Sequence, residues 1–356
     1  MSRETRRSFI GKMVMIALAF AGWSGFGKGT KSVFSQKMTP VKGGKAPVAS
    51  FRPGYLRLHE TDELRKRGRE LWAMMSACRL CPRECGVNRL KGTAGFCGAA
   101  SDLVISSHGP HYGEERPLVG RGGSGAVFMS HCGLRCVFCI NWEVAHEGMG
   151  SAVTIERFAA MMLELQRRGC SNINIVTPSH YSAHVLLALD RAASGGLRLP
   201  LVYNTHGWER PEILRLLDGV VDIYLPDFKY ADGAMAARYS SGAQSYPEIT
   251  RNALREMHRQ VGIAHHAPDG LMYRGLMIRH LVLPGNASGT REVLRWIAGN
   301  LPRNTYVNLM SQYRPVYRAG EFPEIARRVR RGEYENAVRW AREAGLTNLD
   351  IQASPF

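Results

Sequence analysis

From Gly120 onward, short apolar runs alternate with stretches in which apolar residues recur at helical spacing. Short apolar runs between turn residues are typical of buried strands, and spacings of about three and four residues are typical of amphipathic helices. Strands that alternate with helices imply right-handed crossovers and a parallel sheet, either open or curled into a barrel. The expected strands cover residues 126–129, 172–176, 201–205, 220–226, 276–283 and 305–310.

The second expected strand favours the barrel. Side chains alternate between the two faces of a strand, so Asn172 and Asn174 share one face. A strand buried on both faces is usually apolar throughout. A polar lumen would explain the two asparagines, and a surface-facing edge strand is the alternative.

Three helices are expected at other positions. Residues 61–77 place Leu64 and Leu71 at helical spacing, and residues 154–168 begin at Thr154, which can cap the helix. Residues 321–345 form the third pattern, at the end of the chain.

The N-terminus resembles an export signal. Residues 5–12 read Thr-Arg-Arg-Ser-Phe-Ile-Gly-Lys, which matches the twin-arginine pattern, and residues 13–21 form a short apolar run. This run is short for a membrane span. We therefore expect a twin-arginine signal over residues 1–28, export by the twin-arginine machinery, and a periplasmic or membrane-associated protein; a cytoplasmic location is the alternative. Residues 29–60 are interpreted as a linker, because they are rich in Lys, Gly, Ser and Pro.

The chain of 356 residues carries a formal net charge of +17. Such a surface attracts anionic partners. The Lys and Arg residues are spread along the chain without an RNA-binding motif, so nucleic acid is not expected as a partner.

Seven of the eight cysteines fall into two tight groups, which suits metal sites better than disulfides. The second group, Cys132, Cys136 and Cys139, has the spacing CxxxCxxC. Three thiolates can ligate three corners of a [4Fe–4S] cluster, and the remaining iron can then bind S-adenosylmethionine (SAM). The alternative is a structural zinc site with His131 or His146 as fourth ligand.

The first group supplies four thiolates, from Cys78, Cys81, Cys85 and Cys97. Four ligands close a coordination sphere, so this group is either a structural zinc site or a second iron-sulfur cluster. Cys170 stands alone, and we expect it to be a buried packing residue.

At these cysteines the chain resembles the radical SAM superfamily, in particular an uncharacterised branch related to pyruvate formate-lyase activating enzyme. Two positions depart from that pattern: Gly133 stands where relatives usually have Asn, and Ile140 where they have Gln. The motifs that carry the resemblance are residues 78–89, 132–139, 172–180, 203–205, 227–229, 279–285 and 310–313.

The resemblance implies a fold, a cofactor site and an activity. The fold would be α/β, a partial (βα)6-type TIM barrel with an N-terminal cysteine-rich extension and C-terminal helices. The activity would be cleavage of SAM to a 5′-deoxyadenosyl radical that abstracts hydrogen from an unknown substrate, a glycine on a partner protein being one candidate. A low-potential electron donor would be needed. The cofactor-binding candidates are Phe138, Thr177, Ser179, His180, Asn204, Thr205, Asp227, Lys229 and Arg279; no catalytic base is assigned.

The expected organisation beyond the linker is a helix and cysteine-rich segment (61–120), the partial barrel (121–315) and a helical extension (316–356). An alternative function is an exported iron-sulfur or electron-transfer protein without SAM catalysis.

Overall fold

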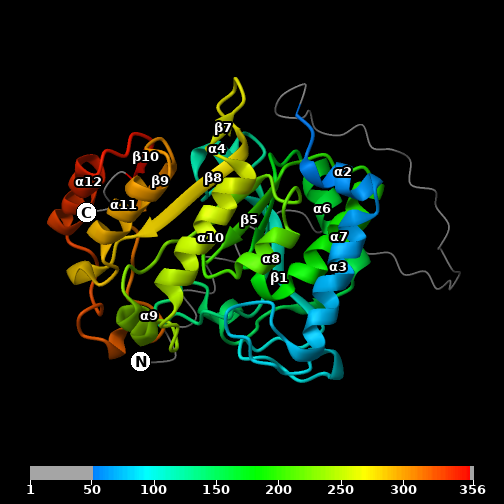
Figure 1. Ribbon diagram of the computed structural model, residues 1–356, viewed down its shortest axis with the longest axis horizontal. Coiled ribbons are helices and arrows are strands. Elements are labelled where there is room, and N and C mark those ends of the chain that lie inside the picture. Colours follow the sequence, from blue (N-terminus) through cyan, green and yellow to red (C-terminus); the bar gives the residue numbers. More distant parts are fainter. Residues whose placement is uncertain (1–50, 353–356) are drawn as a thin grey trace, which may run out of the picture. The chain divides into compact units, whose positions relative to one another are not determined.

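The computed structural model describes residues 51–352 (Figure 1). The predicted twin-arginine signal, and the predicted linker up to residue 50, lie outside the described residues. Within residues 51–352, no helix combines the length and the apolar character that crossing a membrane requires.

A ten-stranded sheet forms the centre of the fold, in the order β10-β9-β8-β6-β5-β4-β2-β1-β3, with β7 paired to β8. The strands from β2 to β10 along this order are parallel, whereas β1 is antiparallel to both its neighbours and β7 is antiparallel to β8. The sheet confirms the expected α/β class with a mostly parallel sheet. The strands are β1 Leu103–His111, β2 Ser124–Met129, β3 Ser151–Val153, β4 Ile173–Val176, β5 Leu201–Thr205, β6 Ile223–Pro226, β7 His265–His266, β8 Met272–Leu281, β9 Tyr306–Met310 and β10 Leu349–Ile351.

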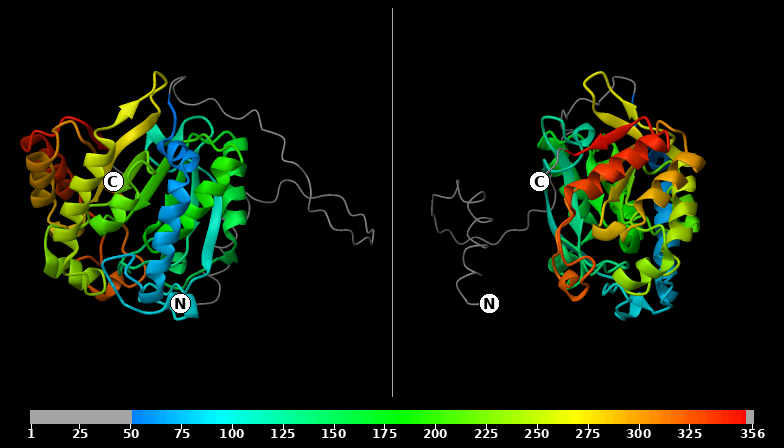
Figure 2. Two further views of the ribbon diagram at one scale, coloured as in Figure 1. Left: turned by 45° about the vertical axis from the view of Figure 1, so that its right-hand side comes forward. Right: turned by 90° about the vertical axis from the view of Figure 1, so that its left-hand side faces the viewer.

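Helices connect most of the parallel strands and pack against the sheet (Figures 1 and 2). The α-helices are α2 Gly54–Glu60, α3 Glu63–Ala73, α4 Arg116–Val119, α5 Trp142–Ala145, α6 Ile155–Arg167, α7 Ser182–Ser194, α8 Pro211–Leu216, α9 Gly233–Tyr239, α10 Tyr246–Val261, α11 Thr290–Asn300 and α12 Arg331–Glu343. Short 3₁₀ helices are η1 Met74–Ala77, η2 Arg89–Lys91, η3 Ser179–Tyr181, η4 Pro284–Asn286 and η5 Ala319–Glu321.

Helix α6 shows how the local sequence sets its bounds. The Thr154 hydroxyl accepts a hydrogen bond from the Arg157 amide at 3.1 Å, which caps the first turn. Phe158, Met162 and Leu165 are buried on one face of the helix. The prediction for residues 154–168 is therefore confirmed.

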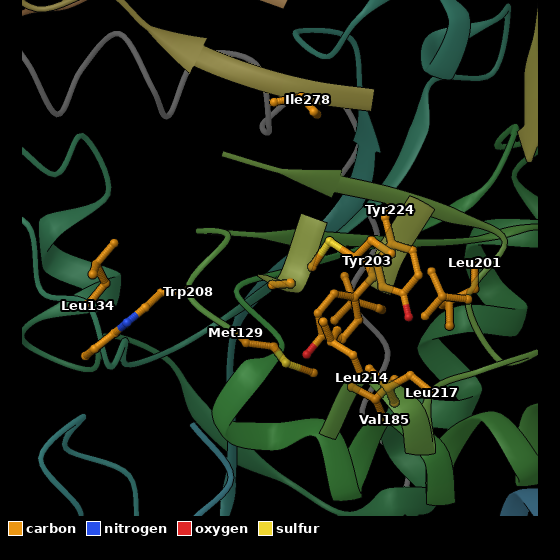
Figure 3. Close-up of a cluster of buried hydrophobic side chains, with 14 of the residues drawn as sticks. Met129, Leu134, Val185, Leu201, Tyr203, Trp208, Leu214, Leu217, Tyr224 and Ile278 are labelled. Carbon is orange, nitrogen blue, oxygen red and sulfur yellow. The ribbon is translucent and has the colours of Figure 1, made fainter. Parts of the chain in front are cut away.

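The buried core includes tyrosines from adjacent parallel strands. Tyr203 of β5 and Tyr224 of β6 lie edge to face, with 5.9 Å between ring centroids (Figure 3). Leu214 of α8 packs in the same cluster. This packing fixes β5 and β6 beside each other, and both strands end at the cavity described below.

Three expected segments differ from the structure. Helix α2 begins at Gly54, inside the segment interpreted as linker, and its Tyr55 hydroxyl donates to the Leu199 carbonyl at 2.9 Å. The predicted helix over 61–77 changes to 3₁₀ geometry at Met74. The predicted helix over 321–345 was wrong between Phe322 and Arg330, where turns and irregular backbone bury Ile325 and Val329, and α12 begins at Arg331.

The two asparagines of the second predicted strand are buried, and the side-chain amide nitrogen of each donates a hydrogen bond inside the protein. Asn174 Nδ2 donates to Ser124 Oγ at 3.1 Å, Ser124 Oγ donates to Asn172 Oδ1 at 2.7 Å, and Asn172 Nδ2 donates to the Leu118 carbonyl at 2.8 Å. Because β4 pairs with both β2 and β5, the edge-strand interpretation was wrong.

Candidate functional site

A cavity of about 950 Å³ lies where the parallel strands end. The carboxyl ends of parallel strands meet at one edge of a sheet, where loops can bring polar side chains together. Strands β4, β5, β6 and β8 each contribute a polar residue at or just beyond this edge. The polar residues that line the cavity include Thr177, Asn204, Thr205, His206, Asp227, Lys229, Arg279 and Asn308.

The loop after β2 forms another wall of this cavity. Cys132, Cys136 and Cys139 all line it. Two residues of the loop that are not glycine, His131 and Arg135, have φ values of 72° and 52°. Such left-handed backbone costs free energy outside glycine and recurs at functional sites. The loop is thus held in a strained form that brings three sulfurs to one cavity.

Hydrogen bonds fix this loop against α9. The Val137 amide donates to the Tyr239 carbonyl at 2.9 Å, and the Ser240 hydroxyl donates to Cys136 Sγ at 3.1 Å. Burial raises the pKa of the Cys132 thiol to about 11 and that of Cys139 to about 12. Because metal ligands are thiolates, metal binding at these sulfurs must release protons.

Phe138 lies between the last two cysteines of the loop and is 7% exposed. Its ring meets that of Tyr313 at 5.7 Å and that of Tyr230 at 6.4 Å, both edge to face. Phe138 lines the cavity and also anchors the loop to the core.

An ion pair stands at the end of β6. Lys229 Nζ lies 2.7 Å from Asp227 Oδ2. Burial lowers the pKa of Lys229, but the Asp227 carboxylate and the Cys136 sulfur outweigh burial and hold that pKa above its ordinary value. Lys229 therefore stays cationic beside the cysteine loop.

Arg279 of β8 contacts two carboxylates that the sequence analysis did not name as site residues. Its guanidinium forms ion pairs with Glu114 and Glu115, and its Nη1 donates to Asn204 Oδ1 at 3.3 Å. Asn308 Nδ2 donates to Glu115 Oε1 at 2.7 Å. Glu114 and Glu115 precede α4, far from Arg279 in sequence, so the contact depends on the tertiary fold.

Thr177 lines the cavity at the end of β4, with φ of 62°. Its amide donates to the Asn204 carbonyl at 2.8 Å, which ties the ends of β4 and β5 together. A β-branched residue in left-handed backbone is a conformational outlier, so this strand end is strained. Like the cysteine loop, it borders the cavity.

Ser179 and His180 lie outside the residues that line the cavity. Ser179 Oγ donates to Glu209 Oε1, and His180 Nε2 lies 2.8 Å from the Ser130 carbonyl. The Thr205 hydroxyl also donates to Glu209, whose pKa burial raises to about 7. The cofactor contacts predicted for Ser179 and His180 remain predictions. Glu209 is a buried carboxyl group that the sequence analysis missed.

The first cysteine group lies in the predicted loop segment, where η2 is the one helical turn between Cys78 and Cys97. A single metal ion needs several ligands that converge on one point. Within residues 51–352, no group of three or more His, Cys, Asp or Glu side chains has this arrangement. In a cubane, each thiolate binds a different iron, so cluster ligands need not converge on one point.

The alternative ligands and the lone cysteine have other neighbours. His146 Nε2 lies 3.1 Å from the Cys136 carbonyl, and the His131 ring lies against the backbone of Gly98 and Gly148. Cys170 is 3% exposed, as expected of a packing residue.

No protein-family model matches the chain. Two solved structures align with 65% of it: a radical SAM methyltransferase from Sphaerobacter thermophilus (TM-score 0.43, 14% identity, 67% of that chain) and TYW1 with a lysine-pyruvate adduct bound (TM-score 0.42, 11% identity, 75% of that chain). An uncharacterized protein of Methanocaldococcus jannaschii, MJ0674, is 31% identical over 281 residues, which cover 77% of this chain and 76% of that protein. The chain therefore belongs to the family of this Methanocaldococcus protein.

Proposed function

We propose that the chain is a radical SAM enzyme. In this proposal, Cys132, Cys136 and Cys139 hold three irons of a [4Fe–4S] cluster, and the fourth iron accepts SAM. The observation that carries the proposal is that three cysteines of one loop and polar side chains from four strand ends line the same 950 Å³ cavity.

The donor set and the cavity both fit these groups. Three thiols of one loop leave one corner of a cubane without a protein ligand. The cavity has room for a ligand of the size of SAM, because small-molecule pockets usually measure roughly 300–1,000 Å³. Once bound, the cluster and SAM would supply a 5′-deoxyadenosyl radical through reductive cleavage of a carbon–sulfur bond.

The chain's own residues bind and orient the ligands. We assign Thr177, Asn204 and Thr205 to the polar groups of SAM, since their side chains can donate or accept hydrogen bonds. Asp227 can accept bonds from ribose hydroxyls, while Lys229 places a positive charge beside the cluster loop.

Arg279 and Phe138 complete the assignment. Arg279 is paired with Glu114 and Glu115, and we assign these ion pairs to holding the cavity wall at β8 in place. We also assign Arg279 to contact with SAM. Phe138 excludes water from the back of the cysteine loop. In this scheme Ser179 links the segments after β4 and β5 through Glu209, and His180 links the segment after β4 to Ser130, the residue after β2.

We further propose that the substrate loses a hydrogen atom, as in the branch related to pyruvate formate-lyase activating enzyme. Ile140 lines the cavity and is 70% exposed, so an apolar side chain stands beside the cysteine loop where relatives usually have Gln, and the substrate is not assigned. The partial barrel, export by the twin-arginine machinery and the low-potential electron donor belong to the same proposal. They rest on sequence patterns alone.

The test is product formation. Anaerobically reconstituted protein is reduced with dithionite and given SAM, and 5′-deoxyadenosine is measured by chromatography. The proposal expects product from the wild type and from Cys170→Ala, and none from Cys136→Ala. Lack of product from a fully loaded wild-type cluster would favour an exported iron-sulfur or electron-transfer protein instead.

A further inference from the structure

Arg89 is a buried cation without a carboxylate partner in residues 51–352. It is 0% exposed, and its guanidinium donates to the carbonyls of Ala100 and His180 at 2.7–3.0 Å. Its other neighbours are Cys78 Sγ, 3.8 Å from Nη1, and the ring of Tyr181, whose centroid lies 5.6 Å from the guanidinium carbon. Carbonyl groups satisfy the donors but supply no negative charge.

A buried charge is stable only when other groups compensate it. The sulfur beside Arg89 belongs to the four-cysteine group, Cys78, Cys81, Cys85 and Cys97. Neutral thiols would leave the cation uncompensated. Four metal-bound thiolates would compensate it, since either a zinc ion or a four-iron cluster with four thiolates carries a net charge of roughly −2.

The backbone around the group leaves room for sulfurs. A Cβ on Gly95 would lie 3.3 Å from Cys85 Sγ and 3.5 Å from Cys97 Sγ. The Ala99 amide donates to Cys97 Sγ at 3.5 Å. Amide hydrogen bonds to cysteine sulfur are a means by which proteins tune iron-sulfur clusters.

The four-cysteine group lies against the loop of the second group. A Cβ on Gly133, the residue after Cys132, would lie 3.4 Å from Cys81 Sγ. Arg83 bridges the two: its Nε donates to the Gly133 carbonyl at 2.8 Å, and its Nη2 donates to the Ser240 carbonyl at 3.0 Å. Ser240 in turn donates to Cys136 Sγ. The two cysteine groups therefore share a boundary and a hydrogen-bonded link.

We propose that Cys78, Cys81, Cys85 and Cys97 hold a second [4Fe–4S] cluster that passes electrons to the cluster of Cys132, Cys136 and Cys139. Zinc would balance Arg89 equally well but carries no electron, whereas direct contact with the second group suits a redox centre. The identity of the acceptor rests on the proposed function.

The electron balance needs an external carrier. A low-potential one-electron donor, an iron-sulfur or flavin protein, reduces the four-cysteine cluster by one electron. That cluster is reoxidised as the cluster of Cys132, Cys136 and Cys139 takes the same electron. The four-cysteine cluster has no open iron, so SAM does not bind to it.

Metal analysis of the anaerobically reconstituted full-length chain tests this assignment. The wild type and the control Cys170→Ala should each hold about eight iron and eight sulfide per chain. The triple variant Cys132→Ala/Cys136→Ala/Cys139→Ala should keep about four of each, with an EPR signal, after dithionite reduction, that SAM does not change. Cys81→Ala/Cys97→Ala should keep about four, with a signal that SAM does change.

Stoichiometric zinc, or no metal, in the folded triple variant would overturn the assignment. If that variant does not fold, a redox titration of the wild type decides: two one-electron steps support the second cluster, and a single step contradicts it. A wild type with two clusters but no 5′-deoxyadenosine would contradict the proposed function while leaving this site intact. A wild type that forms 5′-deoxyadenosine but holds only one cluster would support the proposed function and contradict the second cluster.

Discussion

The Ser240 hydroxyl donates a hydrogen bond to Cys136 Sγ at 3.1 Å, and the Tyr230 hydroxyl lies 2.9 Å from Ser240 Oγ. A hydrogen bond to a ligating sulfur stabilises the extra negative charge of a reduced cluster. Ser240→Ala should therefore lower the reduction potential of the Cys132/Cys136/Cys139 cluster. A bond of about 1 kcal/mol corresponds to a shift on the order of 40 mV. A redox titration followed by EPR measures this shift.

Ser241→Ala is the matched control, because Ser241 Oγ donates to the Arg135 carbonyl at 3.0 Å and not to a sulfur. Its potential should stay near that of the wild type. Equal shifts in the two variants would mean that the Ser240 bond has no specific effect on the cluster.

Arg279 compensates two buried carboxylates, whose side chains are 6% exposed in Glu114 and 2% in Glu115. Burial would raise the pKa of Glu114, but Arg279 and His111 outweigh burial and lower that pKa to about 2. Arg279→Gln should reduce the free energy of unfolding by about 3–5 kcal/mol in urea titrations, because it leaves those charges unpaired. Arg331→Gln breaks an exposed pair with Glu335 and should cost less than about 1 kcal/mol. Similar losses in both variants would contradict this account of Arg279.

Asp222 ties α2 and β5 together with its two carboxylate oxygens. Oδ1 accepts from the Gly54 amide at 3.0 Å, and Oδ2 accepts from the Leu201 amide at 2.9 Å. Asn has one acceptor oxygen in its side chain. In Asp222→Asn, either the Gly54 amide or the Leu201 amide would therefore face the side-chain NH2 group, which is itself a donor. The expected loss is about 1–3 kcal/mol of unfolding free energy. Asp269→Asn, at an exposed position, is the control, and a stable Asp222→Asn would refute the role of this carboxylate.

Glu209 should make the stability of the protein depend on pH. Burial raises the pKa of Glu209 from its ordinary value of 4.5 to about 7 in the folded chain. Between these values the folded chain keeps a proton that the unfolded chain releases, so stability falls as pH rises from about 4.5 to about 7.

Glu209→Gln keeps an acceptor for Ser179 and Thr205 but cannot ionise. Between pH 4 and pH 8, the unfolding free energy of the wild type should therefore fall more than that of the variant. The difference between the two falls should be up to about 3 kcal/mol. Chemical denaturation of both proteins at the two pH values measures the difference. Parallel pH profiles would show that Glu209 does not titrate as its burial implies.

The pattern of the sequence was enough for the strands that carry the cavity. Residues 201–205 coincide with β5, because a short apolar run between turn residues has few alternatives in an α/β chain. β8 begins at Met272, earlier than residue 276, because its first residues pair with β7. Such pairing is not visible in local periodicity.

The cysteine loop could be recognised because its spacing is a local property of the chain. Glu115 and Glu209 could not, since an acidic residue gains its role from what the fold places beside it. The same holds for Arg89: the sequence analysis included it in the motif of residues 78–89 without a role, and its complete burial depends on the fold.

The central claim is that the cluster held by Cys132, Cys136 and Cys139 binds SAM. The most direct test is the EPR spectrum of the variant Cys81→Ala/Cys97→Ala, reduced with dithionite and recorded with and without SAM. That variant retains the Cys132, Cys136 and Cys139 loop, so its spectrum reports on this cluster alone. We predict a four-iron signal whose g values shift when SAM is added. A loaded, reducible cluster whose spectrum is unchanged by saturating SAM would contradict the account.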